Sequence, residues 1–268
     1  MRIIRFFDED DKECYGHNYQ NGTANLLEGQ LFGEPLKDTG RQARVKKLLA
    51  PLQPTAILCI GLNYREHAEE TGTPLPKYPI LFMKNPAALN HPGDPIVLPR
   101  LCLDPPEVDY ETELAVVIGK PAKNVPAAEA LNYVTGYTVG NDVSARRWQK
   151  HGGAGQWVRG KSFDTFCPLG PELVTTDEIP DPQSLQLRCI LNNEVMQDAN
   201  TSDMIFPVAE LIEYLSGGTT LLPGTVILTG TPSGVGFTRE PPVFLKPGDV
   251  VEVSIEGIGR LRNSVVSE

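Results

Sequence analysis

Short apolar runs, separated by glycine, proline and polar clusters, set the pattern of hydrophobic positions along this chain of 268 residues. Runs of this length that stop at turn residues are typical of buried strands. Strands are expected at residues 56–61, 80–82, 96–98, 114–118, 185–191, 225–229 and 250–255. Helices are fewer, and they are expected at residues 41–47, 64–70, 127–133, 144–150 and 206–215. The pattern therefore predicts a β-rich α+β protein.

Two domains are expected from the way these runs are distributed. Residues 1–52 carry short strand-like pieces and a basic stretch, which predicts a small N-terminal domain, and residues 53–268 form the main domain. The 25 glycines and 24 prolines agree with many turns between short strands.

The charge of the chain argues against some partners. A formal net charge of −10, without a run of basic and aromatic residues, disfavours nucleic acid as a ligand. No apolar stretch approaches eighteen residues, and the N-terminal residues lack the features of a signal peptide. A soluble, cytoplasmic protein that binds neither nucleic acid nor membrane is expected. The five cysteines form no C-x-x-C pair, so neither a disulfide framework nor a zinc site is indicated.

Glu111 and Glu113 stand at the head of the apolar run 114–118. Alternate residues of a strand share a face, so the two carboxylates are expected side by side, and like charges this close favour a neutralising cation. Asp142 ends the strand-like segment 136–141 and could complete a site of three carboxylates. Oxygen ligands suit Mg²⁺ or Mn²⁺ better than zinc. The alternative is a solvated strand face, but the apolar run that follows places these residues at the mouth of a core.

His67 and Glu70 are three residues apart in the helix expected at residues 64–70. Positions i and i+3 share a helix face, so Glu70 can bind one nitrogen of the imidazole and leave the other free to act as a base. A solvated helix surface is the alternative. The position of this helix directly after a buried strand favours a functional role.

Lys161 lies in residues 155–162, which match the phosphate-binding pattern G-x-x-x-x-G-K-[ST]. The pattern would suggest a nucleotide hydrolase. That function is rejected because no buried strand precedes the motif and because proline and glycine interrupt any long helix after it. Lys161 could instead orient a carboxylate or hold an anionic substrate. Arg146 and Gln149, at i and i+3 of the helix expected at 144–150, could bind a carboxylate. The glycines of residues 229–236 could bring backbone N–H groups close to an anionic ligand, or could simply form a tight turn.

Taken together, these motifs resemble the fumarylacetoacetate hydrolase superfamily over residues 56–256. The resemblance is carried by GLNY (61–64) with His67 and Glu70, ETE (111–113), GYTVGNDVSAR (136–146), GKSFD (160–164) and LTGTP (228–232). The segments FDTFCPLGP (163–171) and PPVFLK (241–246) are most similar to the subgroup that includes oxaloacetate tautomerases and hydroxyheptadienedioate isomerase-like proteins.

The resemblance implies a mixed β-roll catalytic domain, a small N-terminal domain, a homodimer and a loop after the His-bearing helix that orders as a lid. It also implies a role for each site residue. By this resemblance the metal ligands are Glu111, Glu113 and Asp142, the catalytic residues are His67, Glu70 and Lys161, and the substrate-binding residues are Arg146, Gln149 and Thr231. The metal is expected to be Mg²⁺, with Mn²⁺ or Ca²⁺ as alternatives. One departure is Arg147, which stands where the family usually has aspartate.

The resulting hypothesis is a Mg²⁺-dependent enzyme that acts on small 2-oxo acids through a metal-stabilised enolate. Hydrolytic C–C cleavage or decarboxylation of acylpyruvate-like or oxaloacetate-like substrates is slightly favoured by the His67 and Glu70 pair. Keto–enol tautomerisation or isomerisation without bond cleavage remains open, as does a non-catalytic relative that acts as an interaction module.

Overall fold

A computed structural model of the chain describes residues 1–152 and 154–268. The strands of its largest sheet are β1 (Arg2–Phe7), β2 (Glu13–Gln20), β3 (Thr23–Glu28), β4 (Lys37–Arg44), β5 (Lys47–Leu49), β6 (Ala56–Gly61), β7 (Ile80–Lys84), β8 (Leu89–Asn90), β11 (Thr112–Ile118), β12 (Val134–Asn141), β14 (Cys167–Thr175) and β17 (Thr225–Leu228). Among the described residues the order is β4-β3-β2-β1-β14-β12-β11-β17-β6-β7, with β5 on β1 and β8 on β14. The sheet is mixed, because β17 and β6 are parallel whereas β11 is antiparallel to both of its neighbours.

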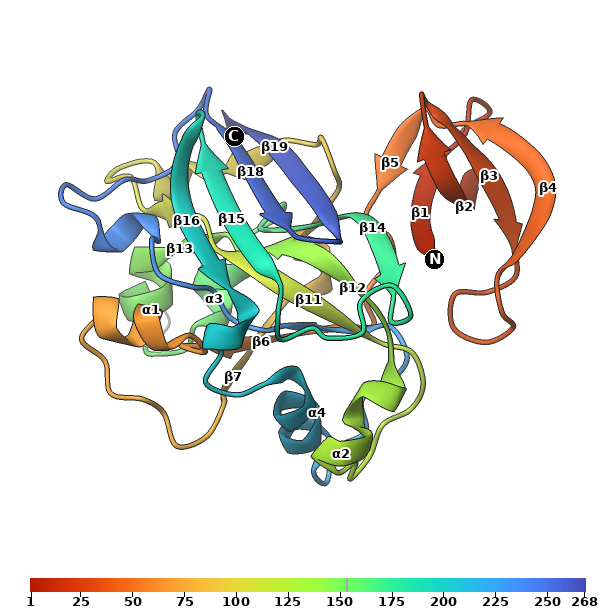
Figure 1. Cartoon of the computed structure of the whole chain (residues 1–268). Helices are drawn as coiled ribbons and strands as arrows, with labels where there is room; N and C mark the ends of the chain where they lie inside the picture. The colour runs from red at the N-terminus through yellow and green to blue at the C-terminus, as the bar shows by residue number, and fades with distance from the viewer. Residues whose placement is uncertain (153) are drawn as a thin grey trace.

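A second sheet packs against the main one (Figure 1). Its strands are β9 (Ile96–Leu98), β15 (Gln186–Leu191), β16 (Glu194–Asn200), β18 (Val250–Ile255) and β19 (Gly259–Ser267), in the order β16-β15-β18-β19-β9. A short pair joins β10 (Val108–Asp109) to β13 (Ser144–Ala145). The α-helices are α1 (Arg65–Glu70), α2 (Ala127–Ala130), α3 (Val158–Lys161) and α4 (Val208–Ser216). Single turns are η1 (Pro86–Ala88), η2 (Arg100–Cys102), η3 (Leu131–Tyr133), the π-helical η4 (Trp148–Gly152), η5 (Thr201–Asp203) and η6 (Gly236–Thr238). The β-rich α+β fold is confirmed.

The central strand β11 is buried on both faces and separates two hydrophobic cores. Alternation along the strand sends Leu114, Val116 and Ile118 into the core shared with the second sheet. Ala115 and Val117 point into the other core, which β6 and β17 also line. A strand buried on both faces reads as a continuous apolar run, which is why residues 114–118 carry no polar position. The end of β11 that bears Glu113 is thereby held rigidly.

The N-terminal strands β1–β5 form a lobe to one side of the body in Figure 1. Strand β1 joins the main sheet through β14, and Ile4, Phe6 and Ala24 form a small core within the lobe. The helix expected at residues 41–47 was a wrong prediction, since this segment belongs to β4 and β5. Its backbone groups pair with β3 and β1, and pairing with distant strands overrides local propensity. The boundary after residue 52 falls between β5 and β6 and remains a prediction.

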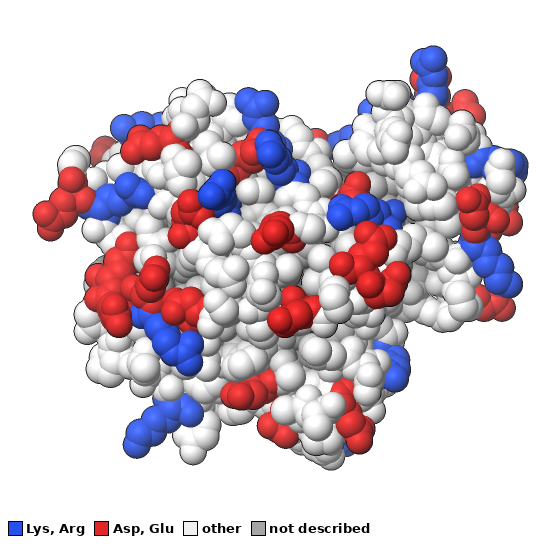
Figure 2. Space-filling view, viewed as in Figure 1, with Lys and Arg blue, Asp and Glu red and all other residues white. Residues whose placement is uncertain are grey.

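The surface and the cysteines agree with a globular chain. Lys and Arg are interspersed with Asp and Glu over the face shown in Figure 2. Cys59, Cys102, Cys167 and Cys189 are buried free thiols, as small core residues often are. Within the described ranges, no helix has both the length and the apolar character needed to cross a bilayer.

Candidate functional site

Two neighbouring strands bring three carboxylates together at one end of the central sheet. Glu113 lies in β11 opposite Gly140 of β12, Glu111 directly precedes β11, and Asp142 directly follows β12. The backbone N–H of Asp142 donates to the carbonyl oxygen of Glu111 at 2.9 Å, which locks this register. One oxygen from each carboxylate lies within 4.8 Å of the others, and all three residues are buried. The convergence expected from strand alternation is therefore present.

Buried cations surround these carboxylates. Nζ of Lys161 donates to Oε2 of Glu111 at 2.7 Å and to Oδ2 of Asp142 at 2.8 Å. Nζ of Lys84, on β7, donates to Oδ1 of Asp142 and, at 3.1 Å, to the carbonyl oxygen of Val143. Neither lysine is more than 1% exposed. Lys161 is bound by two carboxylates of the protein. The Gly160–Lys161 pair therefore does not indicate a phosphate-binding loop.

The neighbouring charges shift the pKa values of Glu111 and Glu113 in opposite directions. Burial alone would raise the pKa of Glu111, but the charges of Lys161 and Arg146 outweigh burial and lower that pKa to about 2. Burial, together with the charges of Asp142 and Glu111, raises the pKa of Glu113 well above its usual range. Ionisation of Glu113 is therefore unfavourable, because the neighbouring cations leave its negative charge uncompensated.

A divalent cation fits this donor set. Hard carboxylate oxygens are the ligands that Mg²⁺, Mn²⁺ and Ca²⁺ accept, and the group offers neither histidine nor cysteine. The backbone N–H of Gly230 donates to Oε2 of Glu113 at 2.8 Å, and no donor from the described residues reaches Oε1. A cation beside Oε1 would compensate the negative charge of Glu113 and so stabilise its ionised form.

His67 and Glu70 form a hydrogen-bonded pair on α1. Nδ1 of His67 and Oε2 of Glu70 are 2.9 Å apart, which leaves Nε2 of the imidazole outside this bond. Oε1 of Glu70 accepts from the backbone N–H of Gly234 at 2.9 Å and from Oγ1 of Thr238 at 2.8 Å. Burial would raise the pKa of Glu70, but these hydrogen bonds outweigh it and lower the pKa. Glu70 is thus an ionised acceptor that fixes the orientation of the imidazole.

Arg146 and Gln149 lie together, although the helix expected at residues 144–150 begins later than predicted. Ser144 and Ala145 form β13 instead, because they pair with β10. The guanidinium of Arg146 contacts Oδ2 of Asp109 at 2.8 Å, Oε1 of Glu111 at 2.6 Å and Oε1 of Gln149 at 3.1 Å. Arg146 is therefore a link between the acidic cluster and the wall of the cavity.

Thr231 lines the cavity, and its loop is hydrogen-bonded to the acidic residues of the site. Oγ1 of Thr231 donates to the carbonyl oxygen of Thr112 at 3.1 Å and accepts from Nε2 of Gln197 at 2.8 Å. The loop glycines expected to approach an anionic ligand donate instead to carboxylates of the protein, namely Gly230 to Glu113, Gly234 to Glu70 and Gly236 to Asp109. The loop thus positions acidic side chains of the site.

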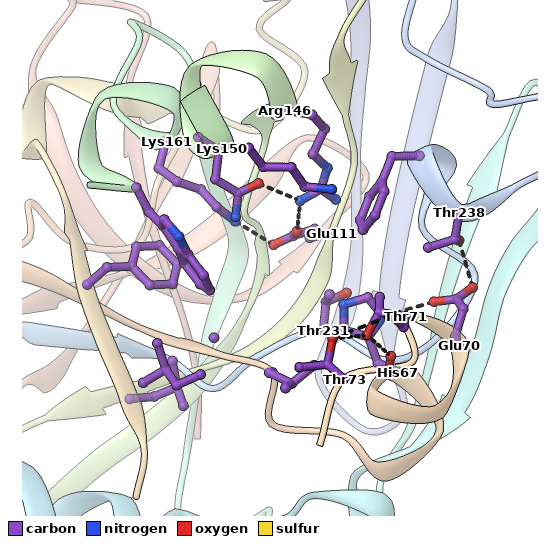
Figure 3. A pocket seen from close by; sticks show the side chains of 18 of the residues that line it. His67, Glu70, Thr71, Thr73, Glu111, Arg146, Lys150, Lys161, Thr231 and Thr238 are labelled. Carbon is purple, nitrogen blue, oxygen red and sulfur yellow. Dashed lines mark hydrogen bonds and ion pairs between the residues drawn. The ribbon is translucent and has the colours of Figure 1, made fainter. Parts of the chain in front are cut away.

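A cavity of about 460 Å³ joins these groups. It is lined by eight of the nine site residues predicted from sequence, several of which are labelled in Figure 3. The ninth, Asp142, does not line the cavity but is hydrogen-bonded to Lys161. Thr71 and Thr73, which follow α1, also line it, and they belong to the segment predicted to act as a lid. Farther along this segment, the ring of Tyr78 stacks on that of Tyr214 from α4 at 6.4 Å between centroids.

Arg147, which stands where the family usually has aspartate, forms an ion pair with Glu107. Nη2 of Arg147 lies 3.0 Å from Oε1 of Glu107, and the backbone N–H of Arg147 donates to Oε2 of the same residue at 2.6 Å. Glu107 is only 3% exposed, so it requires such a partner. Arg147 does not line the cavity. Its effect is therefore on local pairing.

Sequence reasoning missed three residues of the site: Lys84, Asp109 and Lys150. Lys84 follows the apolar residues 80–83, and a lone lysine at the end of an apolar strand-like run is a signal that could have identified it. Asp109 precedes Glu111 by two residues, so the same alternation that selected the glutamates includes it. Lys150 is adjacent to Gln149, and only the geometry of the turn reveals that it lines the cavity.

Comparison with known proteins agrees with this geometry. Residues 56–266 match the family model described as fumarylacetoacetate (FAA) hydrolase, C-terminal. The chain is similar to a mitochondrial oxaloacetate tautomerase of Bos taurus, with 51% identity over 219 residues, or 81% of this chain and 69% of the relative.

Two solved structures are similar over the whole chain. A 5-carboxymethyl-2-hydroxymuconate delta-isomerase from Mycobacterium smegmatis has a TM-score of 0.85 and 40% identity, with 100% of each chain covered. A 2-hydroxyhepta-2,4-diene-1,7-dioate isomerase from Mycobacterium marinum has a TM-score of 0.83 and 41% identity, covering 100% of this chain and 99% of that one. The family model spans most of the chain and the folds agree from end to end, so this protein belongs to the fumarylacetoacetate hydrolase family.

Proposed function

We propose that this chain is a divalent-metal-dependent enzyme that enolises small 2-oxo acids, with keto–enol tautomerisation or isomerisation as the net reaction. The observation that carries the proposal is the convergence of Glu111, Glu113 and Asp142 beneath a cavity that also contains the His67–Glu70 pair. The relatives named above, an oxaloacetate tautomerase and two isomerases of unsaturated hydroxy acids, support this class of reaction.

Glu111, Glu113 and Asp142 would hold the metal, which we take to be Mg²⁺, with Mn²⁺ or Ca²⁺ as alternatives. When bound, the cation would act as an electrophile for the carboxylate and keto oxygens of a 2-oxo acid and stabilise the charge of the enolate. Lys161 fixes two of the three carboxylates and contributes positive charge at the floor of the cavity.

His67 is the proposed base. With Nδ1 held by Glu70, Nε2 takes the proton from the carbon next to the keto group and gives a proton to the enolate oxygen, which yields the enol; the reverse order converts enol to keto. Arg146 and Gln149 are proposed to bind the carboxylate end of the substrate. Thr231 is proposed to contact the substrate from the opposite loop, in an orientation set by Gln197.

Hydrolytic C–C cleavage or decarboxylation is the second candidate. The His67–Glu70 pair favours it, because an imidazole oriented in this way can also activate water. A non-catalytic relative is the third possibility, and it predicts no metal-dependent turnover of any oxo acid.

The decisive experiment follows oxaloacetate, supplied as its enol, by ultraviolet absorbance and by NMR in the presence of Mg²⁺ or EDTA. Metal-dependent loss of the enol signal with retention of all four carbons in one product supports tautomerisation. Pyruvate formed at the same rate supports decarboxylation instead. Equal rates with Mg²⁺ and EDTA would contradict the metal-dependent mechanism.

His67→Ala tests the base, and His17→Ala is its matched control. The imidazole of His17 also pairs with a carboxylate, since Nε2 lies 2.8 Å from Oδ2 of Asp38, but it is on β2 outside the cavity. We expect His67→Ala to lower kcat by about 100-fold, the usual contribution of a positioned base, and His17→Ala to leave it unchanged. Full activity of His67→Ala would remove His67 from the mechanism.

A homodimer and a cytoplasmic location remain proposals. Strand β7 ends the order of the main sheet and exposes Leu81 by 48% and Met83 by 43%, which supports burial of this edge against a second copy. Sedimentation equilibrium of the wild type and of Leu81→Lys tests that arrangement.

A further inference from the structure

Lys150 is a basic side chain of the cavity that has no acidic partner among the described residues. The other two basic chains that line the cavity are each paired, Arg146 with Asp109 and Glu111, and Lys161 with Glu111 and Asp142. No carboxylate oxygen of residues 1–152 or 154–268 lies within 4.0 Å of Nζ of Lys150. Its charge is therefore available to a ligand.

The local backbone directs Lys150 into the cavity together with the residues proposed to bind substrate. Arg146, Gln149 and Lys150 are at positions i, i+3 and i+4, which share one face of a helical turn, and all three line the cavity. Figure 3 shows Lys150 on the same wall as Arg146 and Lys161. The π-helical turn η4 contributes Gln149 and Lys150 to this wall, and such turns are frequent at functional sites.

An aromatic ring holds the ammonium group in place. Nζ of Lys150 lies 4.0 Å from the centroid of the Phe237 ring, and Cζ of Arg146 lies 4.5 Å from the same centroid. The backbone N–H of Phe237 donates to Oδ2 of Asp109 at 3.0 Å, which ties the ring to the acidic cluster. A cation over an aromatic face keeps its charge while its position is restricted.

Of the two cations beside Phe237, Arg146 is paired with Asp109 and Glu111, and the charge of Lys150 has no acidic partner among the described residues. Burial and the nearby charge of Arg146 lower the pKa of Lys150, and Asp109 offsets this only in part. Nη2 of Arg146 is buried and lacks a well-aligned hydrogen-bond acceptor in the described structure, although Oδ2 of Asp109 is 2.8 Å away. An anionic group placed here would accept hydrogen bonds from both side chains and relieve their repulsion.

We infer that Lys150 is a specificity-determining residue that binds the second carboxylate of a dicarboxylic 2-oxo acid. The inference rests on the proposed function. In that function the first carboxylate and the keto oxygen lie toward the cation that Glu111, Glu113 and Asp142 would hold. A second carboxylate then extends toward the wall of Arg146, Gln149 and Lys150. The names of two relatives contain oxaloacetate and a heptadiene-1,7-dioate. Both compounds are dicarboxylates, which agrees with a cation at this position.

The test compares oxaloacetate with its 4-ethyl ester, in which an ethoxy group replaces the second negative charge. Dissociation constants are measured by calorimetry and kcat/KM by enol absorbance, in the presence of Mg²⁺, for the wild type, Lys150→Met and Lys150→Arg. Lys120→Met is the matched control, because Lys120 is also an exposed lysine over an aromatic ring, with Nζ 4.6 Å from the centroid of Tyr133, but is not among the residues lining the cavity.

We expect Lys150→Met to reduce the preference for the diacid over the ester by about five- to tenfold, as for a partly exposed charge-assisted hydrogen bond. Lys150→Arg should retain most of the preference and Lys120→Met all of it. The wild-type preference should also shrink as salt is raised, because salt screens exposed charges. A Lys150→Met protein that keeps the full wild-type preference, in binding and in kcat/KM, overturns the inference. Tight binding of the diacid that depends on Lys150, without turnover, would instead reject the proposed reaction and leave the Lys150 assignment in place.

Discussion

The floor and the rim of the cavity are built in different ways. At the floor, Lys84, Lys161 and Asp142 are at most 1% exposed, and each has two hydrogen-bonding partners. Lys84 ends strand β7, Asp142 follows strand β12, and Lys161 ends helix α3. At the rim, Glu70 and Lys150 lie on single helical turns, and their side chains reach solvent. Burial and paired charges leave the floor little freedom, and Glu70 is likewise held by His67, Gly234 and Thr238. Lys150 has no acidic partner among the described residues, so this position of the rim suits substrate preference, whereas the floor and the His67–Glu70 pair suit chemistry that is shared within a family.

Lys84→Met should give the largest loss of stability. The substitution removes one of the two cations that bind Asp142 and leaves a buried carboxylate undercompensated, which costs about 3 kcal/mol. The matched control is Lys47→Met, which breaks the exposed Lys47–Asp94 pair and should cost less than about 1 kcal/mol. Urea unfolding in EDTA measures both. Equal losses for the two variants would contradict the distinction between a buried floor and an exposed surface.

Gly230→Ala should be the next most damaging substitution. Gly230 has a φ of +98°, and an added Cβ would lie 2.7 Å from Cβ of Asn63. We expect a loss of about 2 kcal/mol, and reduced activity because the N–H of Gly230 holds Glu113. Gly248→Ala separates strain from crowding, since Gly248 has a φ of +96° with no atom within 4 Å of the added Cβ. If Gly248→Ala is as harmful in thermal unfolding, crowding at the floor is not the cause.

Arg147→Asp extends the comparison to an ion pair that lies outside the cavity. The new carboxylate would face the buried Glu107, and we expect the free energy of unfolding to fall by about 1 to 2 kcal/mol. Arg147→Met, which removes the charge but keeps much of the stem, should cost less. A gain in stability on Arg147→Asp, measured by chemical unfolding at pH 7, would show that Glu107 does not depend on this cation.

Glu70→Gln should have the smallest effect on stability, and a characteristic pH dependence. The folded-state pKa of Glu70 lies below its usual value of 4.5, so the ionised form stabilises the fold above pH 4.5. This stabilisation is lost as the pH falls through the folded-state pKa. The difference in free energy of unfolding between wild type and Glu70→Gln should therefore shrink below pH 4.5. A difference that stays constant over the same range would mean that the hydrogen bonds to Glu70 do not favour its ionised form.

The floor could largely be predicted from sequence because it depends on local rules. Alternation along one strand pairs Glu111 with Glu113, and a neighbouring strand that ends in Asp142 completes the group. The apolar run 114–118 also predicted a buried strand, and the structure shows that both of its faces are buried. Such patterns are preserved in the structure because side chains along a strand of the sheet alternate between its two faces.

Long-range pairing set the limits of the prediction. The basic residues 41–47 carry a helix-compatible composition, but partners in β3 and β1 draw them into strands. Lys84 is 58 residues from Asp142 in sequence, so only the packed structure shows that they form an ion pair. The loop glycines were linked to an anionic ligand or a tight turn, and their N–H groups donate to Glu113, Glu70 and Asp109 of the protein itself. Such contacts have no signature within a window of neighbouring residues.

Titration with Mn²⁺ tests the central claim most directly, because it detects the ion independently of any substrate. Calorimetry should show one saturable site per chain in the wild type. Binding should be weakened by at least about 100-fold in Glu113→Gln and Asp142→Asn, and unchanged in the control Asp198→Asn, which alters an exposed carboxylate on β16. Absence of saturable binding in the wild type, or equal affinity in all four proteins, would contradict the assignment of these carboxylates as a metal site.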